Sequence, residues 1–325
     1  MTARPILAMG SWGPDVEIVQ RCLEVMPLDG DFGPITQEAV MRFQRQQHLE
    51  SDGIVGPDTW AALEQIYVIP PYPPPLLPPL TSNQLDGIAR IVNDNQDVIY
   101  YDWKDRGLSP TGYVMGMAVG WAIVVQKYLL RYSAQHEMAK ANTWESDYDA
   151  IAWYADVFAN RQMDNSIAGL DTLRHLWVLL YGLGMRESSG RYCEGRDMSA
   201  DNVSADTAEA GLFQMSWNAR SCSPHMQRLF DEYSQEGALL QGGKDVFSTD
   251  VECSRSDWEC YGSGAGYEYQ KLAKEAPQLA VETTAIGLRN LRQHWGPINR
   301  KEVEVRPEVD DMFLEIQEFI APTEV

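Results

Sequence analysis

The sequence predicts a mainly all-α protein made of two helical domains. Apolar residues recur at helical spacing along most of the chain, no run shows the sustained alternation of a strand, and prolines crowd into one short segment, Val68 to Leu80. We therefore expect a small three-helix bundle at 1–66, a linker at 67–80 and a larger helical domain at 81–325. The larger domain has room for at most a small β-hairpin, in the polar segment from Arg191 to Ala210.

The composition limits the classes of partner. Of 325 residues, 44% are hydrophobic and 10% aromatic, which predicts a sizeable packed core. Lys and Arg number 26 against 47 Asp and Glu, a formal net charge of −21. Because binding to nucleic acid relies on clustered Lys and Arg, this balance argues against nucleic acid as a partner. No Gly-rich phosphate loop is visible, so we expect no cofactor, and we expect a monomer.

An internal repeat organises the first domain. The segment "DGDFGPITQEAV" begins at Asp29, and "DGIVGPDTWAAL" begins at Asp52. Each copy contains Gly-Pro, and proline suits the first position of a helix, so a helix is expected after each. We expect Asp15 to cap an earlier helix. The predicted inward stripes are Val16, Val19, Leu23 and Met26 for the first helix, and Ile35, Ala39, Val40 and Phe43 for the second.

A spacer and a buried helix come next. Prolines as dense as those in "VIPPYPPPLLPPL" favour an extended linker, with a proline-rich recognition ligand as the alternative. The stretch from Gly112 to Val125 is shorter than the roughly 20 apolar residues that cross a bilayer. We interpret it as a central helix in which Gly116 and Gly120 allow close packing, so no membrane span is expected. The N-terminus lacks a basic head before an apolar core, so we expect synthesis in the cytoplasm without a secretory signal.

Three further helices are expected in the larger domain. One has an apolar face from Leu173 to Leu183 and leads to Glu187. Another spans 276–296 and stops at Gly296, and the last begins at Pro307.

The cysteine pattern leaves the redox state open. Cys193, Cys222, Cys253 and Cys260 fall together and allow three pairings. One or two bridges are expected if the protein works outside the cytoplasm, and free buried thiols are the alternative.

Glu187 is the strongest candidate for chemistry. In "YGLGMRESSGRYCEGRD", from Tyr181 to Asp197, it closes an apolar helix and precedes a polar, glycine-bearing segment. A carboxyl group held against apolar neighbours resists ionising, so its pKa rises and it can act as a general acid near neutral pH. Glycosidic bond cleavage needs such a proton donor. A solvated charge at a helix end is the alternative.

The N-terminal unit resembles a known domain type. From Gly10 to Leu63, with both glycine-bearing turns, it is similar to the small three-helix peptidoglycan-binding domain that is attached to many cell-wall hydrolases. The resemblance implies bacterial peptidoglycan as the partner. An inert helical cap is the alternative.

The segments "RESSG" and "AGLFQMS" resemble the lysozyme-like superfamily, closest to the soluble lytic transglycosylases and goose-type lysozymes. In that family a Glu-Ser pair ends a helix, and a Gly-Leu-apolar-Gln segment lines the sugar groove. By this resemblance Glu187 is the catalytic acid, with Ser188 beside it and Gln214 in the glycan cleft. The segment "CYGSGAGYEY" loosely echoes a late motif of lytic transglycosylases, which suggests Tyr261 or Tyr267 as a groove residue.

The resemblance leaves the second catalytic group open. Goose-type lysozymes carry an aspartate shortly after the Gln, where this chain offers no acid. Phage-type lysozymes place a carboxylate on a hairpin at the distance that Asp197 has here, ten residues after Glu187, while Asp201, Asp206 and Glu209 compete with it. A second carboxylate that holds water would give hydrolysis. With Glu187 alone, the substrate's N-acetyl group can assist and leave anhydro ends, as in lytic transglycosylases.

Other chemistries find less support in the residues. The five histidines are scattered, "HEMAK" at His136 lacks the second histidine of a zinc helix, and no cysteine has a clear histidine partner nearby. Several tryptophans can stack on sugars or belong to the core: Trp177, Trp217, Trp258 and Trp295.

Together the two resemblances imply a glycosidase that cuts the β-1,4 bond between N-acetylmuramic acid and N-acetylglucosamine in the cell wall. A phage endolysin has this organisation, and an injected antibacterial effector would share it. A non-catalytic wall-binding protein is the hypothesis from another class.

Overall fold

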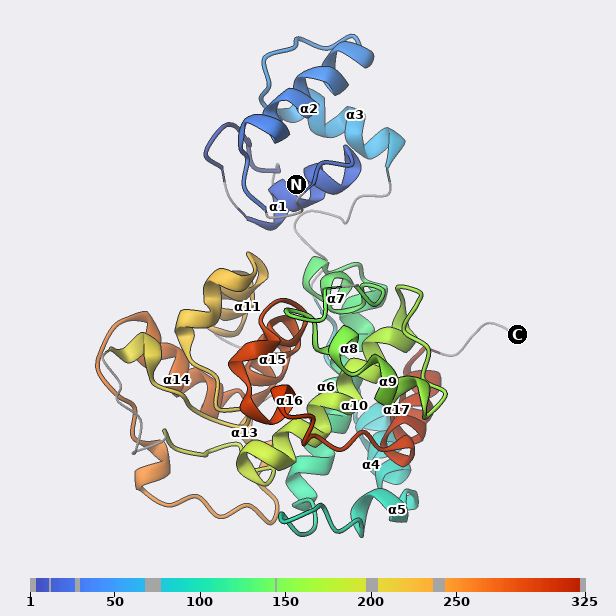
Figure 1. Cartoon of the computed structure of the whole chain (residues 1–325), viewed down its shortest axis with the longest axis vertical. Helices are drawn as coiled ribbons and strands as arrows, with labels where there is room; N and C mark the ends of the chain where they lie inside the picture. The colour runs from blue at the N-terminus through green and yellow to red at the C-terminus, as the bar shows by residue number, and fades with distance from the viewer. Residues whose placement is uncertain are drawn as a thin grey trace.

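The computed structural model describes residues 4–11, 13–26, 30–67, 77–143, 145–196, 204–235 and 243–321. Two helical bodies with separate hydrophobic cores make up the molecule, a small bundle of α1 to α3 and a larger domain of the remaining helices (Figure 1). No strand occurs in the described ranges, which hold only isolated β-bridges, so the all-α prediction is confirmed. Most of the predicted linker, residues 68–76, lies outside these ranges.

The N-terminal bundle consists of α1 (Pro14–Cys22), α2 (Pro34–Gln46) and α3 (Pro57–Ile66). Each helix has a glycine at its N-cap and a proline in its first turn, where the missing N–H of proline costs nothing. The helices enclose one small core: Leu7, Val16, Ile18, Val19, Phe32, Val40, Phe43, Val55, Trp60 and Leu63.

Two buried glutamines build the two equivalent turns of this bundle. The Gln20 side chain accepts a hydrogen bond from the Gly30 N–H and donates to the Asp31 carbonyl and the Thr36 hydroxyl. In the second copy Gln44 accepts from the Gly53 N–H and donates to the Ile54 carbonyl and the Thr59 hydroxyl. Each amide thereby satisfies polar groups of the turn that would otherwise be buried without partners. The repeat therefore has a structural role, and each glutamine lies upstream of the copy whose turn it supports.

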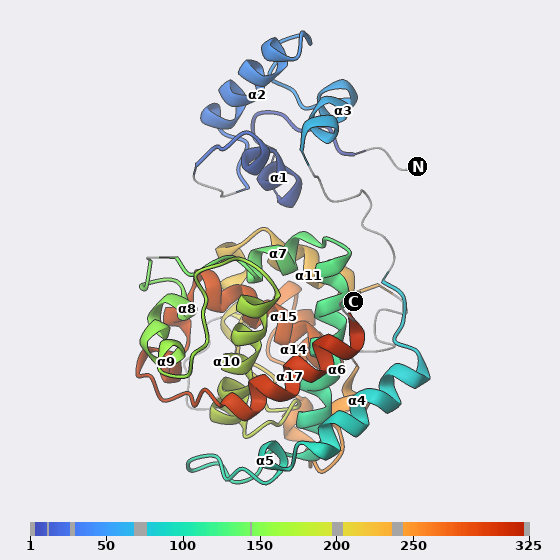
Figure 2. The same ribbon diagram turned by 90° about the vertical axis from the view of Figure 1, so that its right-hand side faces the viewer.

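The larger domain has its longest helices at the centre. It comprises α4 (Ser82–Asp94), α5 (Gln96–Ile99), α6 (Thr111–Leu129), α7 (Ser133–Met138), α8 (Ala150–Trp153), α9 (Ala155–Ala159), α10 (Leu170–Ser188), α11 (His225–Tyr233), α13 (Lys244–Phe247), α14 (Ala265–Glu275), α15 (Pro277–Asn290), α16 (Gly296–Asn299) and α17 (Pro307–Ile320). Short 3-10 turns are η1 (Ala205–Thr207), η2 (Trp217–Cys222), η3 (Ser256–Trp258) and η4 (Arg292–His294). Helix α6 packs against α4, α10 and α17 (Figure 2), and it also packs against α13.

Helix α6 is the buried central helix that the sequence predicts. A side chain at Gly116 would meet the ring of Phe247, and one at Gly120 would meet Gln278, so both glycines allow close approach of neighbouring elements. Among the described residues, no helix has the length and apolarity to cross a membrane.

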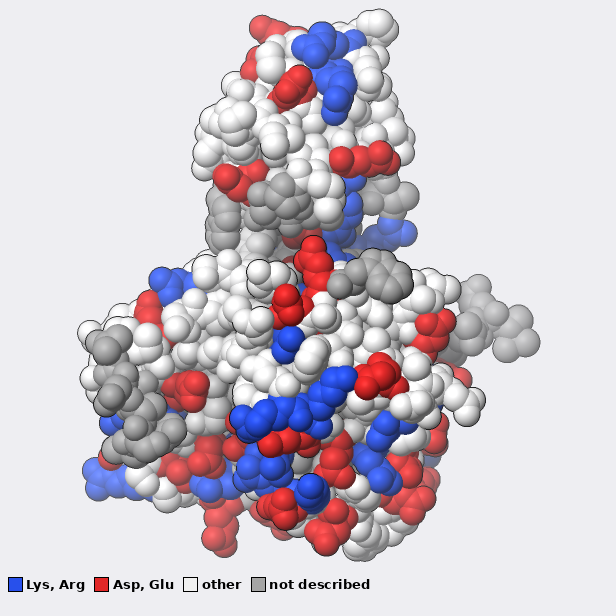
Figure 3. Space-filling view, viewed as in Figure 1, with Lys and Arg blue, Asp and Glu red and all other residues white. Residues whose placement is uncertain are grey.

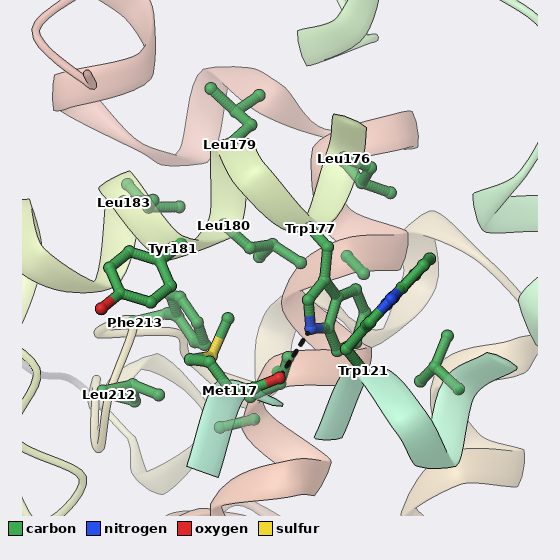
Figure 4. Packing of buried hydrophobic residues seen from close by; sticks show 14 of the residues in the cluster. Met117, Trp121, Leu176, Trp177, Leu179, Leu180, Tyr181, Leu183, Leu212 and Phe213 are labelled. Carbon is green, nitrogen blue, oxygen red and sulfur yellow. Dashed lines mark hydrogen bonds between the residues drawn. The ribbon is translucent and has the colours of Figure 1, made fainter. Parts of the chain in front are cut away.

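Aromatic packing joins α6 to α10. The Trp177 indole N–H donates to the Met117 carbonyl at 3.2 Å, and the rings of Trp121 and Trp177 lie 5.8 Å apart (Figure 4). Trp177, Trp217 and Trp295 are all buried, which places these three in the core, while Trp258 is half-buried. Helix α10 is thereby anchored before it reaches Glu187.

Several sequence predictions about elements are wrong in detail. Gly13, not Asp15, caps α1, because the Gly-Pro signal already starts the helix two residues earlier. Met26 and Ile35 are exposed, since α1 ends at Cys22 and Ile35 lies in the first turn of α2 on its outer side. The helix expected up to Gly296 ends at Asn290, and Gly296-Pro297 instead starts α16, the role that Gly-Pro plays throughout this chain.

One disulfide forms, between Cys193 and Cys253, and Cys22, Cys222 and Cys260 are thiols. The bridge ties the segment after α10 to the loop that precedes η3. On the face drawn in Figure 3, acidic and basic side chains are interspersed over the larger domain, with a band of Lys and Arg across its middle.

Candidate functional site

The candidate site lies at the C-terminal end of α10. Glu187 occupies the last turn of this helix, and Ser189 and Gly190 follow with positive φ angles of 54° and 75°. The Ser189 N–H donates to the Met185 carbonyl at 3.0 Å, and the Gly190 N–H donates to the Gly184 carbonyl at 3.1 Å. This left-handed closure satisfies carbonyls at the helix end and turns the chain sharply away after Glu187.

Close packing fixes the end of α10. Added side chains at Gly184 and Gly190 would collide with Tyr113 of α6, and one at Gly182 would collide with the Glu304 carbonyl. The Tyr113 hydroxyl also donates to the Tyr181 carbonyl at 2.6 Å. The glycines around Glu187 therefore allow neighbouring segments to approach the backbone closely, and this close packing fixes the position of the glutamate.

Ser188 connects α10 to the segment of Gln214. Its side chain is buried, and its hydroxyl lies 2.8 Å from the Leu212 carbonyl and 3.1 Å from the Gly184 carbonyl. The motifs "RESSG" and "AGLFQMS", which are separate in the sequence, are thus in direct contact. The hydroxyl serves this junction, and a contact of Ser188 with substrate stays a prediction.

The segment around Gln214 is a tight turn closed by the bridge between Ala210 and Met215. Gln214 has a φ of 48°, and its backbone N–H and side-chain amide both donate to the Gly211 carbonyl, at 3.2 and 3.0 Å. Trp295 holds the turn from the other side, since its indole N–H donates to the Phe213 carbonyl at 2.9 Å. Figure 4 shows Leu212 and Phe213 beside Tyr181 of α10. Burial of these two side chains anchors the turn to the core by about 1.5–3 kcal/mol each.

The environment of Glu187 favours the protonated form of its carboxyl group. The side chain is half-buried, and burial, assisted by the negative charge of Glu209, raises the pKa of Glu187 to about 7. Arg106, Arg300 and Arg186 oppose this rise, but only from a distance. Within the described part of the chain, no cation forms an ion pair with Glu187. A carboxyl group of this kind is partly protonated at neutral pH, as a general acid must be.

A neighbouring acid draws the nearby cations away from Glu187. The Arg300 guanidinium donates to both oxygens of Glu302, at 2.8 and 3.0 Å, and Arg186 lies 3.6 Å from the same carboxylate. These hydrogen bonds lower the pKa of Glu302, which therefore carries the negative charge in this group. The cations are thus engaged while Glu187 remains the proton-bearing acid.

A pocket of about 770 Å³ opens next to the end of α10. Ser189 and Arg106 line one side of it, and the loop 250–254 with Asp257 lines the other. The disulfide holds that loop through Cys253, and Arg191 donates to Asp257 at 2.8 Å. Glu187 itself does not line the pocket, which borders the site through Ser189.

The other predicted site residues lie in different surroundings. Asp197 and Asp201 lie outside the described residues. Asp206 pairs with Arg220 at 2.9 Å, whereas the charge of Glu209 acts on Glu187. Tyr267 is half-buried on α14, which packs against η1 and η2, the two turns that flank the Gln214 segment.

Sequence reasoning ranked Glu209 below Asp197 and missed the arginines around Glu187. Arg186 directly precedes Glu187 in the sequence, whereas no spacing indicates Arg106 and Arg300, because they come from two distant parts of the chain.

Comparison with known proteins bears on the N-terminal bundle. Residues 13–63 match the family model of a putative peptidoglycan binding domain. We call these residues the peptidoglycan-binding bundle. An uncharacterized protein in the bpoA1 3′ region of Kitasatospora aureofaciens is 42% identical over 69 residues, which cover 19% of this chain and 58% of that protein. The chain thus spans little more than half the length of this curated relative.

Among solved structures, the Burkholderia AP3 phage endolysin aligns over 98% of this chain and 100% of its own, with 16% identity and a TM-score of 0.19. A TM-score this low carries no argument about the larger domain.

Proposed function

We propose that this protein is a peptidoglycan glycosidase that cuts the β-1,4 bond between N-acetylmuramic acid and N-acetylglucosamine, with Glu187 as the general acid. The observation that carries the proposal is the pKa of about 7 at Glu187, an acid without an ion-pair partner in the described chain, in a protein with a peptidoglycan-binding bundle. The proton-donating carboxyl and the wall-binding unit are independent features, and both suit the same polymer.

In the proposed reaction Glu187 donates its proton to the glycosidic oxygen as the bond breaks, because an unprotonated sugar oxygen is a poor leaving group. The sugar ring develops positive charge, which the new carboxylate of Glu187 and the negative charge of Glu209 would stabilise. Gln214 and Tyr267 are proposed to contact the glycan. The peptidoglycan-binding bundle raises the local concentration of the active site at the wall.

The second step depends on the second carboxylate. Glu209 is a candidate because its charge acts directly on Glu187, and Asp197 remains the other candidate. Either could hold a water molecule and give reducing ends by hydrolysis. If neither takes part, Glu187 returns as a base and the product carries an anhydro ring, as in a lytic transglycosylase.

The decisive experiment combines one variant with product analysis. Glu187→Gln should lower the release of soluble fragments from purified sacculi by at least about 10²–10⁴-fold, the usual contribution of a general acid. Co-sedimentation with sacculi should be unchanged, and Glu318→Gln, an exposed acid on α17, is the matched control. Full activity in Glu187→Gln would defeat the proposal, and absence of glycan cleavage in the unaltered protein would indicate a wall-binding protein without turnover.

Mass spectrometry of the released muropeptides decides between the two reactions. Reducing ends indicate a lysozyme-type hydrolase, and anhydro ends indicate a transglycosylase. Freed peptide stems would contradict both. The biological setting, a phage endolysin or an injected effector, is a separate proposal that these products do not address.

A further inference from the structure

Three buried ionisable side chains meet between the peptidoglycan-binding bundle and the larger domain. Glu17 comes from α1, Glu137 from α7 and His225 from the first position of α11. Their side chains are 4%, 4% and 0% exposed. Figures 1 and 2 place α7 and α11 at the end of the larger domain that faces α1. Nothing in the proposed glycosidase reaction uses these residues.

The three groups converge on one point. The Nε2 atom of His225 lies 2.9 Å from Oε2 of Glu17 and 3.3 Å from Oε2 of Glu137. Among the described residues they form the one group of His, Cys, Asp or Glu whose ligand atoms all lie within 4.8 Å of one another. A single proton on Nε2 can point well at only one of the two oxygens. Two buried carboxylates around one imidazole make a site that suits a centre more positive than a neutral ring.

A second set of residues orients both carboxylates. Oε1 of Glu17 is bound by Arg21, and Oε1 of Glu137 accepts from the Asn290 side-chain amide. The Ser223 hydroxyl donates to Oε2 of Glu137 at 2.8 Å. Oε1 of each carboxylate is thus held by a neighbouring side chain and Oε2 faces His225, with Ser223 also bound to Oε2 of Glu137. Metal ligands are commonly held in this way by an outer layer of hydrogen bonds.

We propose that Glu17, Glu137 and His225 form an interdomain site for a divalent transition-metal ion of the zinc class. Ligand atoms bound to tetrahedral zinc at 2.0–2.2 Å lie roughly 3.3–3.6 Å apart. The His225 to Glu137 separation is 3.3 Å, the His225 to Glu17 separation of 2.9 Å is shorter, and all three ligand atoms lie within 4.8 Å of one another. Imidazole among the ligands favours zinc over magnesium or calcium. Ser223 or a water molecule would complete the coordination.

The ion would fasten the two domains together. Glu17 belongs to the peptidoglycan-binding bundle and the other two ligands to the larger domain, so the site exists only when the domains are docked. The two domains also approach each other closely at Gly30, where an added Cβ would lie 3.0 Å from the Pro224 ring. The site does not depend on Glu187, so it stands or falls separately from the proposed glycosidase activity.

The test measures metal on the full-length chain. Protein stripped with a chelator is titrated with Zn²⁺ by calorimetry, and the bound metal is quantified by mass spectrometry. One Zn²⁺ per chain is expected. Co²⁺ in its place should give the intense visible absorption of a tetrahedral site. Small-angle scattering should show a compact metal-loaded chain and a larger radius of gyration after chelation.

Graded variants identify the ligands. Glu17→Gln and His225→Gln should abolish stoichiometric binding, and Asn290→Ala should weaken it about 10–100-fold, the usual effect of removing an outer hydrogen bond. His48→Gln is the matched control, because His48 is an exposed histidine of the same bundle and its loss should change nothing.

If the ligand variants fail to fold, the metal measurements on the unaltered protein still test the proposal. Absence of stoichiometric Zn²⁺ and of the Co²⁺ spectrum would mean that a proton alone joins the three groups, and the proposal would be wrong. Retention of binding in Glu17→Gln and His225→Gln would place the metal elsewhere and would also overturn it.

Discussion

Glu187 and Glu282 are both shielded from water in the larger domain, but Glu282 has a cationic partner and Glu187 has none in the described chain. Glu282 on α15 is fully buried, and its carboxylate accepts from Lys127 at 2.8 and 2.9 Å, from Tyr233 at 2.6 Å and from Gln135 at 2.7 Å. Glu187 is less buried but has no ion-pair partner in the described chain, and its pKa rises to about 7. Burial with a partner fixes a charge in place, whereas burial without one holds a proton ready for transfer.

The buried cation Lys127 also keeps its charge because it has partners of opposite charge. Burial alone would lower its pKa, but the charges of Glu282 and Glu232 hold the pKa above its ordinary value. The ammonium group therefore stays charged in the interior and links α6 to α15. Glu282 thus has a structural role, whereas Glu187 is the candidate for chemistry, and three predictions test this difference.

The largest expected effect is on the paired site. Lys127→Met leaves the Glu282 carboxylate buried without its cation, so we expect the free energy of unfolding to fall by about 3–5 kcal/mol. Lys301→Met is the matched control, because Lys301 pairs with Asp156 at the surface and should cost no more than about 1 kcal/mol. Urea denaturation of both variants gives the comparison. Equal losses would mean that the buried pair does not carry the stability assigned to it.

The second effect is a gain in stability at the unpaired site. The folded pKa of Glu187, about 7, lies above its ordinary value of 4.5, so ionisation disfavours the folded state. The protein should lose stability as pH rises from about 4.5 through 7, and the loss should be complete above that range. Glu187→Gln removes the ionisation and should therefore be more stable by about 2–3 kcal/mol at pH 8, with no difference at pH 4.

Denaturant midpoints at the two pH values measure this gain, and the slopes should match because the folded structures are alike. A variant that is less stable than the parent at pH 8 would show that the Glu187 carboxylate is stabilised by contacts not seen here.

The smallest effect concerns the tuning by Glu209. Activity should decline above about pH 7, where Glu187 loses its proton. In Glu209→Gln the repulsive charge is gone, so the pKa of Glu187 should fall and the decline should move to lower pH by less than about one unit. The pH profile of sacculus lysis measures the shift, with Glu318→Gln as the control. A loss of more than about 100-fold at every pH would instead identify Glu209 as the second catalytic carboxylate.

Local patterns predicted the helical elements well. Gly-Pro predicted the starts of α2 and α3, and the apolar face before Glu187 predicted α10, because a helix repeats every 3.6 residues and its signal lies within one segment. Gly-Pro also starts α1 and α16, although the sequence predictions did not use it there. The predicted cap at Asp15 lies two residues after the actual one, the apolar stripe was extended to Met26 beyond the end of α1, and Gly296-Pro297 was interpreted as a stop. The motif pair "RESSG" and "AGLFQMS" also identified segments that are joined through Ser188 and Leu212.

By itself, then, the sequence determined that a helix follows each Gly-Pro of the repeat, which helix is central, and that an acid lies at the end of an apolar helix. Only the tertiary structure decided that Cys193 pairs with Cys253 and that the charge of Glu209 raises the pKa of Glu187. It also decided that Lys127 pairs with Glu282, and that Glu17 contacts His225 across the domain boundary. The physical reason is the range of the interactions. Helix propensity acts over a few neighbouring residues, whereas desolvation and charge depend on which surfaces dock, and those partners are separated by tens to hundreds of positions along the chain.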